Sequence, residues 1–160
     1  MWHPKTKSFD HPVEVKDLPE GHPVSLFHSY WQELCGKRKF ALKADFNPAR
    51  VPGLLANIAI TRLDYAGPEF DIHLKLAGER IKEILSIKGK GTYRNDYFSG
   101  DALADRLFLY DHMARKQLVK FFRMTAPFTG REFIEYIVGL FPFSNDGEHI
   151  DHFFLVIETI

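Results

Sequence analysis

The residues that could carry chemistry are few in this sequence, and their spacing argues against most active sites. His149 and His152 are three residues apart at the start of an expected strand. The pleat of a strand places such a pair on opposite faces, which is poor geometry for one metal ion. Glu132 and Glu135 have the same spacing, which argues against a glycosidase-type carboxylate pair. We therefore expect no metal site here.

Nucleophile and phosphate motifs are missing as well. The stretch Gly89-Lys90-Gly91-Thr92 lacks the preceding glycine of a Walker loop, and neither Gly-x-Ser-x-Gly nor His-Glu-x-x-His occurs. Cys35 is the only cysteine, which excludes an internal disulfide and a thiolate zinc site. It lies on an apolar helical stripe, where a small buried hydrophobe is its expected role. The sequence predicts no catalytic residues and no enzyme.

The composition is that of one globular domain with a balanced charge. The chain has 160 residues, of which 45% are hydrophobic and 26% are charged, and a net charge of +0. Neutrality argues against a nucleic-acid partner. Only the basic stretches 37–39 and 88–94 would favour one. The sequence has neither a signal-peptide pattern nor an apolar run of membrane-spanning length, so we expect cytoplasmic residence and no membrane partner.

The chain divides into a tail and a domain. Residues 1–24 contain Pro4, Pro12, Pro19 and Pro23, and repeated proline blocks both helices and strand ladders. We expect this Pro- and His-rich tail to lie over the surface or to be partly disordered, and residues 25–160 to form a single domain.

The first element of that domain is an amphipathic helix over Leu26–Cys35. Its apolar positions recur at spacings of one, three and four, and Gly36 follows where a C-terminal cap belongs. The stripe needs an apolar surface to cover. A second copy of the chain or a partner signalling protein could supply that surface, and the predicted interface residues are Leu26, Phe27, Tyr30, Trp31 and Leu34.

Two strands, two helices and three strands follow along the chain. Period-two patterns and turn residues predict strands at 58–65, 70–76, 118–124, 132–143 and 150–160, with helices at 79–85 and 101–117 between the second and third strands. Segments 43–56 and 88–96 are expected to be an irregular linker and a loop. The fold class is α+β.

The last two strands are apolar on both faces. Tyr136 and Val138 alternate with Ile137 and Phe141, and the final strand repeats the pattern. A strand of this kind must be covered on both sides. We expect the helices of the middle third to cover one face, and the N-terminal helix or a partner subunit to cover the other.

This order of elements resembles that of a PAS domain, a five-stranded antiparallel sheet with helices between its second and third strands. The motifs Phe46-Asn47-Pro48, Val51-Pro52-Gly53 and Leu76-Ala77-Gly78 are similar to those of a bacterial PAS-like family of unassigned function. Lys75 and Glu79 depart from that family's pattern, so no ligand identity carries over. The resemblance implies a stand-alone sensory or regulatory module that acts through protein–protein contacts, as a homodimer or with a signalling partner.

Relatives of this fold hold flavin or haem, and neither cofactor is expected here. The photoactive flavin domains have a reactive Asn-Cys-Arg motif, which is missing around Cys35, and His112 lies off-centre for an axial haem ligand. A pocket for a small apolar molecule between the sheet and the helices remains an option. Its predicted lining is Arg94, Tyr110, His112, Ile134, Tyr136 and Val138. The other interpretation is that these side chains simply fill the core.

A second functional hypothesis is a small-molecule-binding, cone-shaped α+β protein with weak enzymatic activity. Such an enzyme needs an inward His or Asp as a proton carrier, and the inward faces here are almost wholly aliphatic and aromatic. His112 is the residue whose replacement would discriminate between the two hypotheses.

Overall fold

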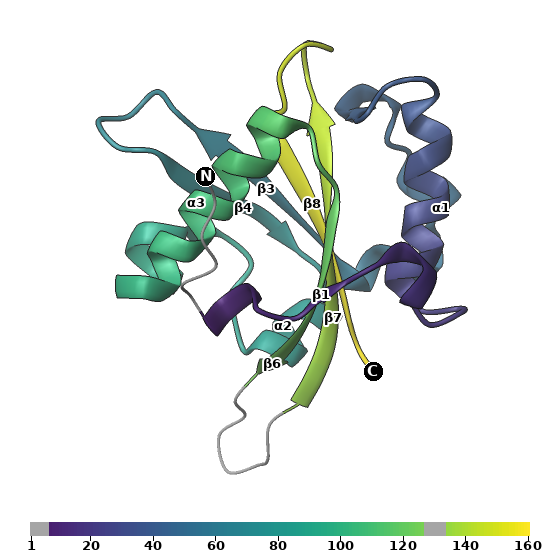
Figure 1. Ribbon diagram of the computed structural model, residues 1–160, viewed down its shortest axis with the longest axis horizontal. Coiled ribbons are helices and arrows are strands. Elements are labelled where there is room, and N and C mark those ends of the chain that lie inside the picture. Colours follow the sequence, from purple (N-terminus) through teal and green to yellow (C-terminus); the bar gives the residue numbers. More distant parts are fainter. Residues whose placement is uncertain (1–6, 127–133) are drawn as a thin grey trace.

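A computed structural model describes residues 7–126 and 134–160, and an antiparallel sheet forms its centre (Figure 1). The five long strands are β3 (Ile58–Asp64), β4 (Asp71–Ala77), β6 (Lys120–Ala126), β7 (Ile134–Ser144) and β8 (His152–Thr159). They pair in the order β6-β7-β8-β3-β4. This confirms the predicted α+β fold with its antiparallel sheet. The start of the fourth predicted strand, residues 132–133, lies outside the described residues.

Three two-residue strands enlarge the sheet beyond the predicted five. They are β1 (Pro12–Val13), β2 (Ala41–Leu42) and β5 (Gly91–Thr92), and β2 runs parallel to β7. Strands this short contain a single alternation of side chains, so period-two reasoning could not find them.

The segment between β4 and β6 covers one face of the sheet. It contains α2 (Glu79–Leu85), a π-helical turn η6 (Tyr93–Tyr97) and α3 (Gly100–Lys116), as predicted for the middle third. The N-cap of α3 is Ser99, so the helix begins at Gly100, one residue before the predicted segment 101–117. We call the apolar layer between these helices and the sheet the inner core, and it contains Tyr110, Phe122, Val138 and Phe153.

The helix α1 (Pro23–Cys35) covers the opposite face, as Figure 1 shows on the right of the sheet. We call the layer beneath it the outer core. The ring centroids of Phe27 and Phe141 are 4.8 Å apart there, and Trp31 Nε1 donates a hydrogen bond of 3.1 Å to the carbonyl of Pro142. The N-terminal helix itself therefore covers the second apolar face. Gly36, with φ +60°, ends the helix as expected.

Close packing of α1 depends on the absence of a side chain at Gly139 in β7. A Cβ atom there would lie 2.9 Å from Val24 Cγ1 of α1 and 2.7 Å from Phe141 Cε2. Cys35, at the other end of α1, is buried, and its burial raises the pKa of the thiol to about 12 against the opposing charge of Arg38. This matches its expected role as a small buried hydrophobe.

The described part of the proline-rich N-terminal segment packs against the sheet. It forms a 3₁₀ turn η1 (Lys7–Phe9), the strand β1 and a second turn η2 (Val15–Asp17), and Pro12 pairs with Phe122 of β6. Phe9 is only 5% exposed, and its ring centroid lies 5.0 Å from that of Phe122. One phenylalanine among polar residues has no period, which explains why the sequence suggested only a tail.

The linker predicted at 43–56 is a series of short 3₁₀ turns. They are η3 (Lys43–Asp45), η4 (Pro48–Arg50) and η5 (Pro52–Asn57). Prolines at the first positions of η4 and η5 favour such turns, because their missing N–H groups would have no partner there. Among the described residues, no helix is long and apolar enough to cross a membrane.

Candidate functional site

A cavity of about 840 Å³ opens beside the inner core. Its walls come from β6 and β7, from α3, from the end of α2 with the following loop, and from the N-terminal segment. Pockets that hold small molecules usually measure roughly 300–1,000 Å³. The apolar part of the lining consists of Leu85, Ile87, Tyr97, Phe98, Met124 and Tyr136.

Arg106 of α3 brings a guanidinium group to this cavity. The Cζ atom lies 3.9 Å from the ring centroid of Phe98 and 5.3 Å from that of Phe9. Nη1 donates a hydrogen bond of 2.9 Å to the carbonyl of Ala102 one turn earlier. Two aromatic rings and one hydrogen bond thus fix the orientation of the group.

Further cationic side chains lie around the cavity. Lys88 and Lys90 belong to the loop after α2, and the hydroxyl of Tyr97 holds that loop by donating to the Lys88 carbonyl at 3.1 Å. Arg123 also lines the cavity, but it pairs with Glu135 at 2.6 Å.

The carboxylates of the lining are Asp10 and Asp96, and both have partners. Asp96 accepts a hydrogen bond of 2.7 Å from the backbone N–H of Thr92, and Asp10 lies 3.4 Å from Nε2 of His11. Apart from the Arg123–Glu135 pair, the described lining residues thus carry Lys88, Lys90 and Arg106 against two carboxylates that both have partners, in a chain whose overall charge is balanced.

Three buried phenols lie near this guanidinium. The hydroxyls of Tyr93 and Tyr110 are 2.9 Å apart in the inner core, and that of Tyr136 has the Sδ of Met124 at 3.8 Å as its contact. Burial raises the pKa of all three, while the charge of Arg106 lowers it by a smaller amount. The phenols are therefore neutral hydrogen-bond donors at physiological pH.

Of the six residues predicted to line a ligand pocket, the structure brings only Tyr136 to the cavity. Tyr110 and Val138 are buried in the inner core, and Ile134 is half-buried at the start of β7. The ligand site at these six residues stays a prediction, and the structure favours a core-filling role for Tyr110 and Val138.

The other two predicted ligand residues lie on different surfaces. The side chain of Arg94 turns toward the β3–β4 connection, where Nη2 donates to the Phe70 carbonyl at 2.8 Å and Nη1 pairs with Glu69 at 3.3 Å. His112 stacks on Phe108, which is 45% exposed, along α3. Burial lowers the pKa of His112, and the charges of neighbouring lysines add to this effect.

Arg106 is the site residue that sequence reasoning missed, although a signal was present. It stands three residues after Leu103 and four before Tyr110, two apolar residues that share one face of the predicted helix 101–117. A cation within an apolar stripe needs a partner or an opening to solvent. The sequence alone could not join the basic stretch 88–94 to Arg106, because their proximity depends on the fold.

Three of the five predicted interface residues are used within the chain. Phe27, Tyr30 and Trp31 are buried in the outer core, whereas Leu26 is 50% exposed and Leu34 is half-buried. An intermolecular contact through α1 stays a prediction. The surface of α1 that is available for such a contact is the solvent-exposed side around Leu26.

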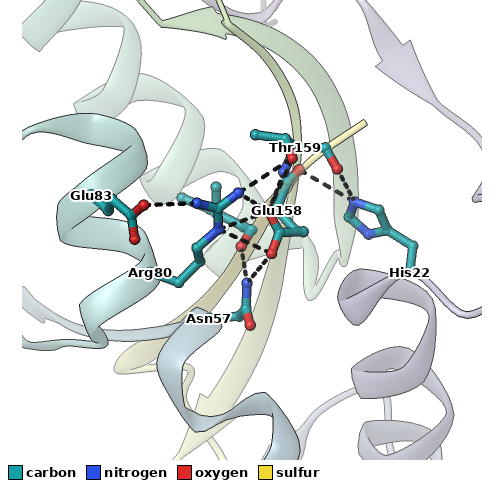
Figure 2. Close-up of polar contacts among 7 residues, drawn as sticks. His22, Asn57, Arg80, Glu83, Glu158 and Thr159 are labelled. Atoms are coloured by element: carbon teal, nitrogen blue, oxygen red, sulfur yellow. Dashed lines mark hydrogen bonds and ion pairs between the residues drawn. The ribbon is translucent and has the colours of Figure 1, made fainter. Parts of the chain in front are cut away.

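A polar network connects α2 through β8 to the beginning of α1 (Figure 2). Arg80 of α2 donates to Glu158 of β8 through Nη2 at 2.9 Å and through Nε at 3.0 Å. Burial raises the pKa of Glu158, but hydrogen bonds from Arg80, the Thr159 N–H and the Asn57 amide together lower it to about 2. The carboxylate is therefore ionised throughout the physiological range.

His22 links the same strand to the beginning of α1. Its Nδ1 accepts a hydrogen bond of 3.1 Å from the Val24 N–H and so caps the helix. Its Nε2 lies 3.2 Å from the carbonyls of Glu158 and Thr159. Because Nδ1 accepts, the proton belongs on Nε2, which donates to β8. Figure 2 shows His22 and Arg80 approaching the strand from opposite sides.

The two histidines considered at sequence level as metal ligands have separate carboxylate partners. His149 Nδ1 lies 3.0 Å from Asp146, and His152 Nδ1 lies 2.7 Å from Asp151. Within residues 7–126 and 134–160, no three His, Cys, Asp or Glu side chains gather in a way that could hold a metal ion.

The fold and the site define a class: an α+β domain whose antiparallel sheet has helices inserted between its second and third long strands and a cavity on the helical side. A protein-family model described as PAS domain matches residues 20–157, and the chain belongs to this family. The match confirms the resemblance seen in the sequence motifs. Comparisons with curated proteins and with solved structures find no match. Membership of the PAS family indicates a sensory or regulatory module.

Proposed function

We propose that this chain is a stand-alone regulatory module that binds a small molecule in the cavity beside Arg106 and acts through protein–protein contacts of α1. One observation carries this proposal: β6 and β7 line the cavity on one face and support α1 on the other. We further propose that the module is cytoplasmic and catalyses no reaction.

The two faces of these strands are coupled by adjacent residues. Met124 and Tyr136 pair across β6 and β7 and line the cavity. Their neighbours Arg123 and Ile137 also pair, and Ile137 belongs to the outer core beneath α1. Since successive side chains of a strand point to opposite faces, the backbone of β7 directly joins Tyr136 in the cavity to Ile137 beneath α1, and we propose that a ligand acts on α1 through this connection.

The network of Figure 2 provides a second connection. Leu85 and Ser86 at the end of α2 line the cavity, and Arg80 of the same helix is bound to Glu158. Glu158 and Thr159 present their carbonyls to His22, the cap of α1. We propose that a shift of α2 on ligand binding is passed from Arg80 through Glu158 to His22, and so to the beginning of α1.

The absence of catalysis is proposed on the chemistry of the cavity. His11 is the only histidine among the described residues that line it, its side chain is 72% exposed, and it faces Asp10 on the surface. A general acid or base usually has its pKa adjusted by burial or by a close charge inside the site. His112, the proton carrier of the alternative hypothesis, does not line the cavity.

A pair of surface variants tests the contact through α1 with a second copy of the chain. Leu26 on α1 and Leu76 on β4 are similarly exposed, at 50% and 54%. We expect wild-type protein to dimerise in sedimentation equilibrium, Leu26→Glu to weaken the dimer by about 10-fold or more, and Leu76→Glu to leave it unchanged, since a charge in an apolar contact is costly.

Two results would contradict the proposal. One is a wild-type protein that stays monomeric at high micromolar concentration and binds no partner at α1. The other is equal behaviour of the two variants, because the contact would then lie elsewhere.

A further inference from the structure

We propose that the ligand of the cavity is an organic anion with an apolar body, and that its carboxylate binds the guanidinium of Arg106. This inference rests on the proposed function, since it names the class of ligand for the same cavity. Four features carry it: the free donors of Arg106, their accessibility, the charge around the cavity and the apolar wall.

The first step is that Arg106 has N–H donors that no described residue uses. Arg80, Arg94, Arg115 and Arg123 all form ion pairs, whereas Arg106 forms none with any described residue. Its single hydrogen bond uses Nη1, although a guanidinium has five N–H donors.

The second step is that these spare donors are accessible. Among the described residues, Arg94 Nε is the only fully buried side-chain nitrogen or oxygen without a hydrogen-bond partner. The unused nitrogens of Arg106 are therefore open to a molecule in the cavity. A planar guanidinium held in place by Phe98 and Phe9 suits a carboxylate, which accepts two parallel hydrogen bonds from it.

The third step is the charge around the cavity. Lys88 and Lys90 add positive charge, and neither forms an ion pair with a described residue. Asp10 and Asp96, the carboxylates of the lining, are engaged with His11 and with the backbone of Thr92. Such a surrounding attracts anions and disfavours cations.

The fourth step is the apolar wall, which requires more than a bare ion. Leu85, Ile87, Phe98 and Met124 line the same cavity, whose 840 Å³ is far larger than a carboxylate. Tyr136 offers a phenol whose contact is the weak acceptor Sδ of Met124 at 3.8 Å. An aromatic or aliphatic body on the wall, with the carboxylate between Arg106 and Tyr136, uses all of these groups.

Matched pairs of probes test this assignment. Naphthoate and decanoate have the same apolar bodies as naphthamide and decanamide, which lack the charge. We expect calorimetric titration of the full-length protein to show each carboxylate binding about 10-fold or more tighter than its amide, as for hydrogen bonds to a charged group.

The control variant for Arg106→Gln is Arg115→Gln, which removes the same charge from the same helix. Arg115 is exposed, pairs with Asp111 and does not line the cavity. We expect Arg106→Gln to lower the affinity for the carboxylates to that for the amides. Arg115→Gln should keep the wild-type preference for the carboxylates. Circular dichroism of both variants verifies that they are folded.

The outcomes separate this inference from the proposed function. Equal affinity of carboxylates and amides, binding of neither, or an unchanged preference in Arg106→Gln would each overturn the inference. Tight binding of carboxylates without any change in the dimerisation or amide exchange of α1 would support the inference and contradict the proposed regulation.

Discussion

Single residues in this protein act mainly by connecting segments that are distant in the sequence. Glu158 is the clearest example, because its carboxylate receives Arg80 from α2, the Asn57 amide from η5 and the Thr159 N–H from its own strand. Its side chain is 22% exposed. A charge with this many donors is stabilising as a set, and the loss of the charge leaves the donors unpaired.

We predict that Glu158→Gln lowers the free energy of unfolding by about 1–3 kcal/mol, as for the loss of charge-assisted hydrogen bonds. Glu83 is the matched control, because it pairs with the same Arg80 at 3.2 Å but is 68% exposed. Glu83→Gln should change the stability by about 0.5 kcal/mol or less. Urea unfolding at neutral pH measures both, and equal effects would show that the network is not centred on Glu158.

The same carboxylate predicts how stability depends on pH. The pKa of Glu158 is about 2 in the folded state and has its ordinary value of 4.5 in the unfolded chain. A lowered pKa means that the contribution is complete above the unfolded value and is lost as the pH falls from about 4.5 to about 2. The difference in stability between wild type and Glu158→Gln should shrink in this window. A constant difference from neutral pH to pH 2 would contradict the assignment.

At the scale of residues, the sequence could predict which side chains are buried but not which charges meet. The alternation of Tyr136 and Val138 with Ile137 and Phe141 gave the two faces of β7 correctly. Arg106 and the loop at Lys88 are remote along the chain, and only the packing of α3 beside η6 brings them to one cavity. Arg80 and Glu158 are 78 residues apart and meet for the same reason.

Among the elements, α1 has a position that depends on a close fit. It lies on β7 at Gly139, where an added Cβ would approach Val24 Cγ1 to 2.9 Å. The long strands and helices were predicted to within a few residues because their apolar periods are strong. The role of Gly139 could not be predicted, because a glycine in a strand has several explanations and the partner helix is far away in sequence.

We predict that Gly139→Ala destabilises the protein by about 1–3 kcal/mol through overpacking and accelerates amide hydrogen exchange in α1. Gly53→Ala is the control, since nothing lies within 4 Å of a Cβ at that position. Exchange measured by mass spectrometry should rise in α1 and remain unchanged in α3. A uniform rise over both helices would indicate general destabilisation instead of a displaced helix.

At the scale of the whole molecule, one sheet separates two apolar cores, and the N-terminal segment closes one edge of it. The strand β1 pairs with β6 at this edge, and Phe9 reaches the inner core. An open sheet edge can pair with other chains, so this short cover also protects the protein from aggregation. The sequence could not predict the cover, because its prolines favour an irregular tail.

We predict that Phe9→Ala lowers the free energy of unfolding by about 2–4 kcal/mol, as for large-to-small substitutions in a core, and promotes aggregation on heating. Val15 in the same segment is 49% exposed, and Val15→Ala should change the stability by about 0.5 kcal/mol or less. Thermal unfolding with simultaneous light scattering measures both properties. If Phe9→Ala is as stable and as free of aggregation as Val15→Ala, the N-terminal segment contributes to neither property.

Because Cys35 is buried at the end of α1, its reactivity reports on the opening of this helix. The chain contains one thiol, and with a pKa of about 12 beneath the helix it is almost entirely protonated at neutral pH. Alkylating reagents react with the thiolate and must reach the sulfur. The rate of alkylation therefore measures how often this helix opens away from the sheet. The natural chain is sufficient for this measurement, because no cysteine has to be introduced.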